Sequence, residues 1–268
     1  MTKLTAVYLA AGLSSRFGGR IKALIRVAPN NQTLMGYSMS QAKKAGFNHF
    51  VIIASKKTID QLKEEYKDSF LGIPVEYALQ ETPEWREKPF GTSHAAHSAK
   101  NIIQGSFIVL NSDDIYGENT LRLMADYLKK NKEGYCIPGY KLKNVVPENG
   151  GVNRGLISVD SENNVTKIVE NFNITKKDIP SRYSGEELIS MNLFGLQPSF
   201  IDFLEKNFPK FLEKIGKDPK KEWLLPDSIS DFAEKHKIKI EVIPTDDVWV
   251  GVTNPEDEEI ARKKLKNQ

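Results

Sequence analysis

The chain begins with a short apolar run that ends in small residues and continues into a polar, basic loop: residues 4–22 are LTAVYLAAGLSSRFGGRIK. The run from 4 to 9 has the length of a buried β-strand, and the Ala-Ala-Gly that follows is typical of a turn. In an open α/β sheet, ligands bind beyond the carboxyl ends of the strands. Small residues there let backbone N–H groups approach an anion, and Arg16 and Lys22 add positive charge. The stretch therefore indicates an anion-binding loop after the first strand.

This loop matches neither of two common phosphate-binding motifs. The chain contains no GxxxxGK[ST] element, and no two of its glycines stand two positions apart, so a GxGxxG loop is absent. Taken alone, a glycine-rich turn with solvated cations is an equally good interpretation of these residues.

Strand-like and helix-like segments alternate from this loop to Gly139. Apolar strand-like runs cover 49–55, 75–79, 107–110 and 135–138, and helix-like segments cover 33–45, 58–70, 92–103 and 118–130. Such alternation is typical of a mainly parallel sheet with helices on both faces. We predict a three-layer α/β/α sandwich with a mixed, mainly parallel sheet.

After Gly139 the pattern changes. Residues 156–159 and 165–169 flank a turn and predict a hairpin, whereas the polar stretch 171–184 predicts a mobile loop. The remaining predicted elements are a strand at 188–196, helices at 199–215 and 227–236, strands at 238–243 and 248–250, and a helix at 255–266. Because there is no internal repeat or low-complexity linker, we predict one domain over residues 1–268, with a small β-rich lid in its second part.

Composition excludes several classes of function. The formal net charge is only +3, and no Lys/Arg-rich tract is interleaved with aromatic residues, so we expect no nucleic-acid partner. Cys136 is the single cysteine, which rules out an intrachain disulfide and a cysteine-based zinc cluster. No run of 18 apolar residues occurs, and the apolar stretch 4–13 lacks the basic lead-in of a signal peptide. We therefore expect a cytoplasmic protein without a membrane partner.

Short segments spread over the chain share one further pattern. They are LAAGLSSRFGG at 9–19 followed by Lys22, Gln80 after the third strand, GTSHA at 91–95, NSDD at 111–114, Gly155 and Glu170, and VTNPED at 252–257. In this order they resemble the nucleotidyltransferase family that includes the sugar-1-phosphate nucleotidylyltransferases, also called NDP-sugar pyrophosphorylases, which have a GT-A-type fold. The first segment is specific, and the later ones gain weight because they follow in sequence.

The resemblance implies an activity and a set of site residues. The activity is nucleotidyl transfer from a nucleoside triphosphate to a phosphorylated small acceptor, a sugar 1-phosphate above all, with Mg²⁺ as cofactor and pyrophosphate as product. Residues 1–139 would form the nucleotide-binding part and 140–268 the acceptor-binding part; a homo-oligomer is left open. The implied residues are Arg16 and Lys22 for catalysis, Leu9, Ala10, Ala11, Gly12, Gln80, Gly91 and Thr92 for the nucleotide, Gly155, Glu170 and Asn192 for the acceptor, and Asp113 for the metal.

Two adjacent aspartates follow the fourth predicted strand. Mg²⁺ prefers carboxylate and phosphate oxygens, so an aspartate at this strand end is well placed to hold it. Because adjacent side chains on a strand point to opposite faces, we expect one of Asp113 and Asp114 to face the site and the other to cap the turn. The resemblance favours Asp113 as the ligand; the alternative is that both are turn residues.

The chain departs from the family's pattern at two places. Many relatives carry a second metal-binding aspartate in the tail motif, where this chain has Gly251 or Thr253. The metal site therefore has one carboxylate fewer, or uses one from Asp114, Asp247 or Asp257. In addition, Asn171 follows Glu170 where several sugar enzymes have a lysine near the sugar phosphate, which leaves the acceptor open.

Several alternatives stay open. The tail motif permits a cytidylyltransferase that acts on a polyol or choline phosphate, and the missing carboxylate permits a non-catalytic nucleotide-binding subunit. Gln80 favours UTP or dTTP as the donor. His94 and His97 stand three apart on a predicted helix, but without a third ligand at metalloprotease spacing they indicate a packed or solvated pair rather than zinc ligands.

Overall fold

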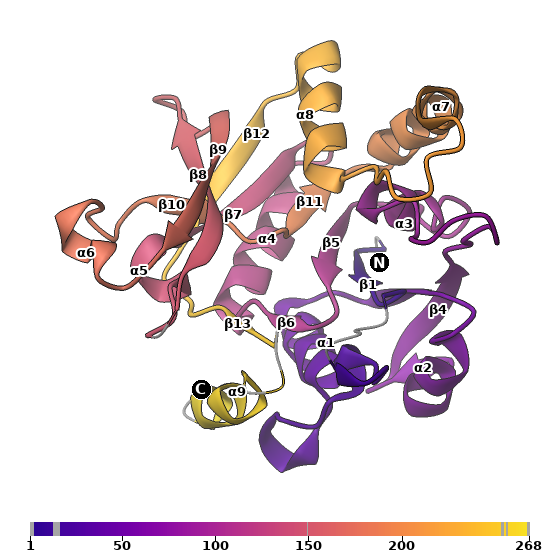
Figure 1. The fold of residues 1–268 in the computed structure, drawn as a ribbon, viewed down its shortest axis with the longest axis horizontal. Coiled ribbons are helices and arrows are strands. Elements are labelled where there is room, and N and C mark those ends of the chain that lie inside the picture. The colour runs from indigo at the N-terminus through magenta and orange to yellow at the C-terminus, as the bar shows by residue number, and fades with distance from the viewer. Residues whose placement is uncertain (1–2, 13–16, 149, 253–254, 256, 267–268) are drawn as a thin grey trace.

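The computed structural model describes residues 3–12, 17–148, 150–252, 255 and 257–266. Its N-terminal half contains a parallel group of strands (Figure 1). They are β1 (Thr5–Leu9), β2 (His49–Ala54), β4 (Ile73–Leu79) and β5 (Phe107–Asn111). β1 pairs with both β2 and β5, and β2 pairs with β4. This arrangement brings the carboxyl ends of all four of these strands to one edge.

The sheet continues from this group into the second half of the chain with mostly antiparallel pairing. In spatial order after β5 come β11 (Phe194–Leu196), β7 (Tyr135–Lys141), β10 (Leu188–Ser190), β8 (Val152–Val159) and β9 (Val165–Ile174). β12 (Ile240–Thr245) pairs in parallel with β7, and β3 (Ser69–Phe70) lies at the opposite edge beside β4. Over the described residues this makes one mixed sheet of 11 strands.

Helices cover both faces of the sheet (Figure 1). The first face carries α1 (Leu34–Ala45), α2 (Ile59–Tyr66) and α4 (Glu118–Lys130), and the second carries α3 (Thr92–His97), α7 (Pro198–Ile215) and α8 (Leu225–His236). Successive strand residues supply the two cores alternately, because side chains on a strand point to opposite faces. On β1, Tyr8 packs into the first core and Val7 into the second. The predicted three-layer sandwich is confirmed.

Helix α1 illustrates how local sequence sets the ends of an element. The hydroxyl of Thr33 accepts a hydrogen bond from the N–H of Gly36 at 3.1 Å and caps the N-terminus. Gly46 ends the helix with a φ of 98°, a left-handed conformation that glycine adopts without steric cost. The predicted boundaries of this helix are therefore correct.

The lid is more ordered than the sequence indicated. The sequence predicts a loop over the polar stretch 171–184, but β9 continues to Ile174, and the short helix α6 (Asp178–Ser181) follows. The carboxylate of Asp178 fixes this turn by accepting from the N–H and the hydroxyl of Thr175, at 2.7 and 2.8 Å. The prediction was wrong because β9 is an edge strand with most side chains exposed, so its sequence lacks apolar alternation.

The predicted strand at 188–196 is divided into β10 and β11. Asn192 lies between them with a φ of 56°, which breaks the extended backbone and lets the chain change neighbours in the sheet. β10 pairs with β8 of the lid, whereas β11 pairs with β5 of the parallel group. This crossing joins the lid to the rest of the sheet at Asn192.

The C-terminal segment returns to the parallel part of the molecule (Figure 1). The remaining elements are β6 (Asp114–Ile115), α5 (Leu142–Val145), β13 (Val250–Gly251), α9 (Asp257–Leu265) and two short 3-10 helices, η2 (Lys22–Leu24) and η3 (Pro29–Asn31). β13 pairs with β6, and α9 packs Leu265 into a small core that also contains Phe17. No helix in the described part of the chain is long and apolar enough to cross a membrane.

Candidate functional site

The ends of the first and fourth predicted strands meet at an ion pair. Lys22 Nζ donates a hydrogen bond to Asp113 Oδ2 at 3.0 Å. The two residues are far apart in sequence, but β1 and β5 are parallel neighbours with Leu9 opposite Asn111, so the segments that follow them lie side by side. Lys22 Nζ also lies 5.5 Å from the centre of the Phe17 ring. The basic loop and the acidic pair therefore form one site.

The described part of the first loop has backbone donors available. The N–H of Ala10 is used, because it donates to the carbonyl of Ile53 at 2.8 Å and extends the sheet. Within the described residues, the N–H groups of Ala11 and Gly12 have no hydrogen-bond acceptor. A Cβ built on Gly12 meets no atom within 4 Å, so the space beside it is open. Arg16 lies outside the described residues.

Asp113 and Asp114 line the same cavity, which corrects the expectation that they face opposite ways. Asp113 lies in the turn between β5 and β6 rather than on a strand, so the alternation of strand side chains does not apply to it. Asp114 is buried, and its Oδ2 accepts from Asn111 Nδ2 at 2.9 Å and from the Tyr116 hydroxyl at 3.3 Å. Burial raises the pKa of Asp114 above its usual range, and the neighbouring charge of Asp113 raises it further.

The cavity has a volume of about 880 Å³ and extends from these carboxylates into the lid. Gly155, Glu170 and Asn192, the three residues that the resemblance implied for the acceptor, all line it. Gly155 on β8 is the cross-strand partner of Glu170 on β9, which explains why two residues so far apart in sequence occur together. The structure thus brings the implied acceptor residues and the implied metal ligand to one cavity.

Two further cavity residues were missed by the sequence analysis. Arg154 precedes Gly155 on β8, and its guanidinium lies 5.2 Å from the centre of the Trp249 ring. Arg154 is also the cross-strand partner of Asn171, the position at which the resemblance implied a lysine. The predicted hairpin began only at Leu156, so nothing in the sequence pattern assigned Arg154 to the strand. Trp249 comes from the tail, and only the pairing of β13 with β6 brings it here.

The described part of the tail next to β6 reaches the carboxylates without adding one. Gly251 lies opposite Asp114 in the β6–β13 pair. A Cβ at Gly251 would lie 2.6 Å from Asp114 Oδ1 and 2.2 Å from the Trp249 ring, so no side chain fits there. Trp249 occupies the space that a second aspartate side chain would need. Thr253, the other matching position, lies outside the described residues.

Of the three aspartates considered as substitutes, only Asp114 lines the cavity. Asp247 caps α4 instead, because its Oδ2 accepts from the N–H and the hydroxyl of Thr120 at 2.7 and 2.9 Å. Asp257 is the first residue of α9.

The implied base-binding residues are also neighbours, at the start of α3. Gln80 Nε2 donates to the carbonyl of Gly91 at 2.9 Å, and the Thr92 hydroxyl accepts from the N–H of Leu225 at 2.8 Å. Gly91 has a φ of 99°, and a Cβ there would lie 2.5 Å from the carbonyl oxygen of Trp223. These bonds fix the turn before α3 against the start of α8.

The two histidines of α3 are packed, as expected. His94 stacks on Phe208 with ring centres 4.7 Å apart, and burial lowers its pKa to about 4. His97 forms a hydrogen bond with Glu205. Within the described residues, no group of three or more His, Cys, Asp or Glu side chains is arranged to hold a metal ion.

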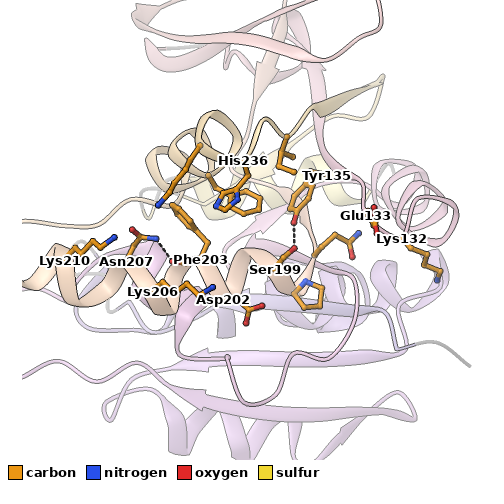
Figure 2. A pocket seen from close by; sticks show the side chains of 15 residues that line it. Lys132, Glu133, Tyr135, Ser199, Asp202, Phe203, Lys206, Asn207, Lys210 and His236 are labelled. Carbon is orange, nitrogen blue, oxygen red and sulfur yellow. Dashed lines mark hydrogen bonds between the residues drawn. The ribbon is translucent and has the colours of Figure 1, made fainter.

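A second cavity of about 710 Å³ lies between α7 and the C-terminal end of α8 (Figure 2). Figure 2 shows Lys206 and Lys210 on α7, and the hydrogen bond of 2.7 Å between the hydroxyls of Tyr135 and Ser199. None of the implied site residues lines this cavity. It is therefore separate from the candidate site.

Comparison with known proteins agrees with this geometry. The family described as "Nucleotidyl transferase" matches residues 7–267. D-glycero-alpha-D-manno-heptose 1-phosphate guanylyltransferase of Campylobacter jejuni is 26% identical over 214 residues, which cover 77% of this chain and 87% of that protein. The bifunctional protein GlmU of Methanococcus maripaludis is 24% identical over 99% of this chain, and the chain spans 55% of its length.

Solved structures share the fold at lower identity. The inositol-1-phosphate CTP transferase of T. maritima has a TM-score of 0.70 at 15% identity, with 99% of this chain and 97% of that chain covered. The mixed sheet and its covering helices are therefore common to this chain and to a solved nucleotidyltransferase.

Proposed function

The chain belongs to the nucleotidyl transferase family, and we propose that it transfers a nucleotidyl group from a nucleoside triphosphate to a sugar 1-phosphate, forming an NDP-sugar and pyrophosphate. The family match and the heptose 1-phosphate guanylyltransferase relative support nucleotidyl transfer to a phosphorylated acceptor. The contact between Lys22 and Asp113 supports a sugar 1-phosphate as the acceptor, because it lies beside the cavity that Gly155 and Glu170 line. Residues 1–139 bind the nucleotide, and residues 140–268 bind the acceptor.

The reaction needs little covalent participation by the protein. A phosphate oxygen of the acceptor attacks the α-phosphorus, one new P–O bond forms, and the bond from the α-phosphorus to the bridging oxygen of pyrophosphate breaks. Catalysis by this chain is then positioning and charge stabilisation. The N–H groups of Ala11 and Gly12, which have no acceptor within the described residues, bind phosphate oxygens, and Lys22 neutralises negative charge as the two phosphates approach. We assign Arg16 to the leaving pyrophosphate on the resemblance alone.

The acidic pair fits a magnesium ion. Mg²⁺ is usually bound through one or two carboxylates, substrate phosphates and water, so a larger protein ligand set is not required. Asp113 and Asp114 offer carboxylate oxygens to one cavity, and the hydrogen bonds from Asn111 and Tyr116 orient Asp114. We propose Asp113 as the main ligand. When bound, the ion withdraws charge from the phosphate oxygens; the residues of the chain orient the substrates around it.

The resemblance places Gln80 and Gly91 near the base, and Gln80 favours UTP or dTTP. The relative from Campylobacter jejuni is named a guanylyltransferase, so GTP belongs in any donor panel.

The test is pyrophosphate release by the purified protein with Mg²⁺. UTP, dTTP, GTP, CTP and ATP are each combined with glucose 1-phosphate, mannose 1-phosphate, N-acetylglucosamine 1-phosphate, inositol 1-phosphate and choline phosphate. Turnover with a sugar 1-phosphate supports the proposal. Turnover restricted to CTP with inositol or choline phosphate would instead identify the cytidylyltransferase alternative. Nucleotide binding without pyrophosphate release from any pair would favour the non-catalytic subunit.

A further inference from the structure

The cavity is rich in carboxylates, although the proposed acceptor is an anion. Among its described lining residues, the acidic side chains are Asp113, Asp114, Glu170, Asp227 and Glu234, and the cations are Arg154 and Lys167. Lys167 is exposed, whereas Arg154 is partly buried. Arg154 is therefore the one sheltered cation among these lining residues, while Lys22 lies beside the cavity in its ion pair with Asp113.

The Arg154 side chain is held rigidly. Its Nε and Nη2 donate to the carbonyl of Val145 at 3.2 and 2.8 Å, and its Nη1 donates to the carbonyl of Asn153 at 3.0 Å. The Trp249 ring, 5.2 Å from the guanidinium, covers it on one side. A group fixed in this way loses little conformational entropy when a ligand binds.

The charge of Arg154 is not neutralised by a direct partner. All three of its hydrogen bonds go to backbone carbonyls, and within the described residues it forms no ion pair. A guanidinium carries five N–H donors, so these bonds leave donors free. A partly buried cation with free donors is suited to bind a phosphate, whose oxygens match the planar fork of arginine.

We infer that Arg154 binds the phosphate of the acceptor and thereby selects phosphomonoesters over neutral sugars. This inference rests on the proposed function and names one residue that decides its acceptor class. Trp249 is a positioning residue, because its ring lies beside the guanidinium and limits the movement of the arginine side chain. The tail of the chain thus takes part in acceptor recognition through a tryptophan.

The test compares Arg154→Gln and Arg154→Lys with the wild-type protein, using the sugar 1-phosphate and nucleoside triphosphate that support pyrophosphate release. Loss of a charged hydrogen bond to phosphate should raise KM for the sugar 1-phosphate by about 10- to 100-fold in R154Q. R154K keeps the positive charge but lacks the planar pair of N–H donors. Its KM for the sugar 1-phosphate should therefore lie between the wild-type value and the R154Q value. KM for the nucleoside triphosphate should change by less than about twofold, a split that general loss of structure would not produce.

Arg182 supplies the matched control. It is an exposed arginine of the same lid that stacks on Tyr183 at 5.1 Å, and it does not line the cavity. Arg182→Gln removes the same charge and should keep wild-type values of both KM constants. Thermal unfolding of each variant shows whether it is folded; if R154Q is not, R154K decides the matter.

Inorganic phosphate is a second probe of the same contact. It should inhibit the wild-type protein competitively against the sugar 1-phosphate, and R154Q should weaken this inhibition by about the same factor as it raises KM. Wild-type KM and wild-type phosphate inhibition in a folded R154Q would overturn the inference while leaving the proposed function intact. Absence of pyrophosphate release from the wild-type protein with every pair would overturn both.

Discussion

At the scale of single residues, the site depends on how two adjacent aspartates divide their contacts. Asp114 is buried and bound by Asn111 and Tyr116, whereas Asp113 is partly exposed and bound by Lys22. Asp113 therefore has the freedom to exchange its lysine contact for a metal ion and a substrate phosphate. Asp114 is held in one orientation by Asn111 and Tyr116, so we expect it to support the site rather than to exchange partners.

Asp113→Asn tests this division. Removal of the carboxylate charge should lower kcat by about 100-fold or more, because it weakens charge stabilisation in the transition state. Asp126→Asn, on an exposed face of α4, is the control with the same chemical change and should keep wild-type turnover. Steady-state pyrophosphate release measures both. A wild-type rate in D113N would remove Asp113 from the metal site.

At the scale of elements, the turn before α3 and the first loop use glycine for different reasons. Gly91 has a positive φ and lies against the backbone of Trp223, so its lack of a side chain is a packing requirement. Gly12 has open space beside it, so its lack of a side chain leaves room for a ligand.

The two glycines should respond differently to alanine. Gly91→Ala should lower the free energy of unfolding by about 2–4 kcal/mol, because the methyl group meets backbone atoms and the φ is strained. Gly12→Ala should stay within about 0.5 kcal/mol of wild type, yet weaken nucleotide binding. Urea unfolding and nucleotide titration measure the two effects. Equal destabilisation by both substitutions would contradict the view that only Gly91 is required for packing.

Helix α3 also makes stability depend on pH through His94. Its pKa is lowered from 6.5 to about 4 by burial, so between these values the unfolded chain binds a proton that the folded chain does not. Stability should therefore fall as the pH drops from 7 to 5, and His94 should account for about 1–2 kcal/mol of the loss. His94→Gln should reduce this difference in urea unfolding at the two pH values. An unchanged pH dependence in the variant would mean that His94 does not carry the effect.

At the scale of the whole molecule, the site is assembled from both ends of the chain. The β5–β6 turn, the lid and Trp249, which precedes β13, line one cavity, and Lys22 of the first loop contacts Asp113 at its edge. An ion pair of 2.7 Å between Arg20 and Glu258 ties α9 to the first loop. A ligand that binds this cavity contacts segments that separate on unfolding. It should therefore raise the free energy of unfolding of the whole molecule.

Thermal unfolding with each nucleoside triphosphate and Mg²⁺ measures this stabilisation by a bound ligand. A ligand present at about 100 times its dissociation constant adds roughly 2.7 kcal/mol, which corresponds to a rise in Tm of several degrees. Lys22→Ala should bind less tightly and show a smaller rise at the same nucleotide concentration. No rise with any triphosphate, even after addition of the sugar 1-phosphates, would contradict nucleotide binding by the first loop.

The sequence by itself determined the fold class and the order of the main elements in the first half, and it predicted Asp113, Gly155, Glu170 and Asn192, which the structure places around one cavity. Buried strands and capped helices have strong local signals, because apolar periodicity and capping residues act over a few neighbouring positions. Thr33 and Gly46 set the ends of α1 in this way, and LAAGLSSRFGG followed by Lys22 predicts a phosphate-binding loop. The match to the nucleotidyl transferase family over residues 7–267 agrees with the resemblance on which that prediction rests.

Only the tertiary structure decided which residues from the lid and the tail complete the site. Arg154 was brought to the cavity by the register of β8 against β9, and Trp249 by the pairing of β13 with β6. Asp113 and Asp114 came to face one cavity because a turn replaces the regular strand between them. Long-range pairing and turn geometry depend on contacts between distant segments, and no short window of sequence records those contacts.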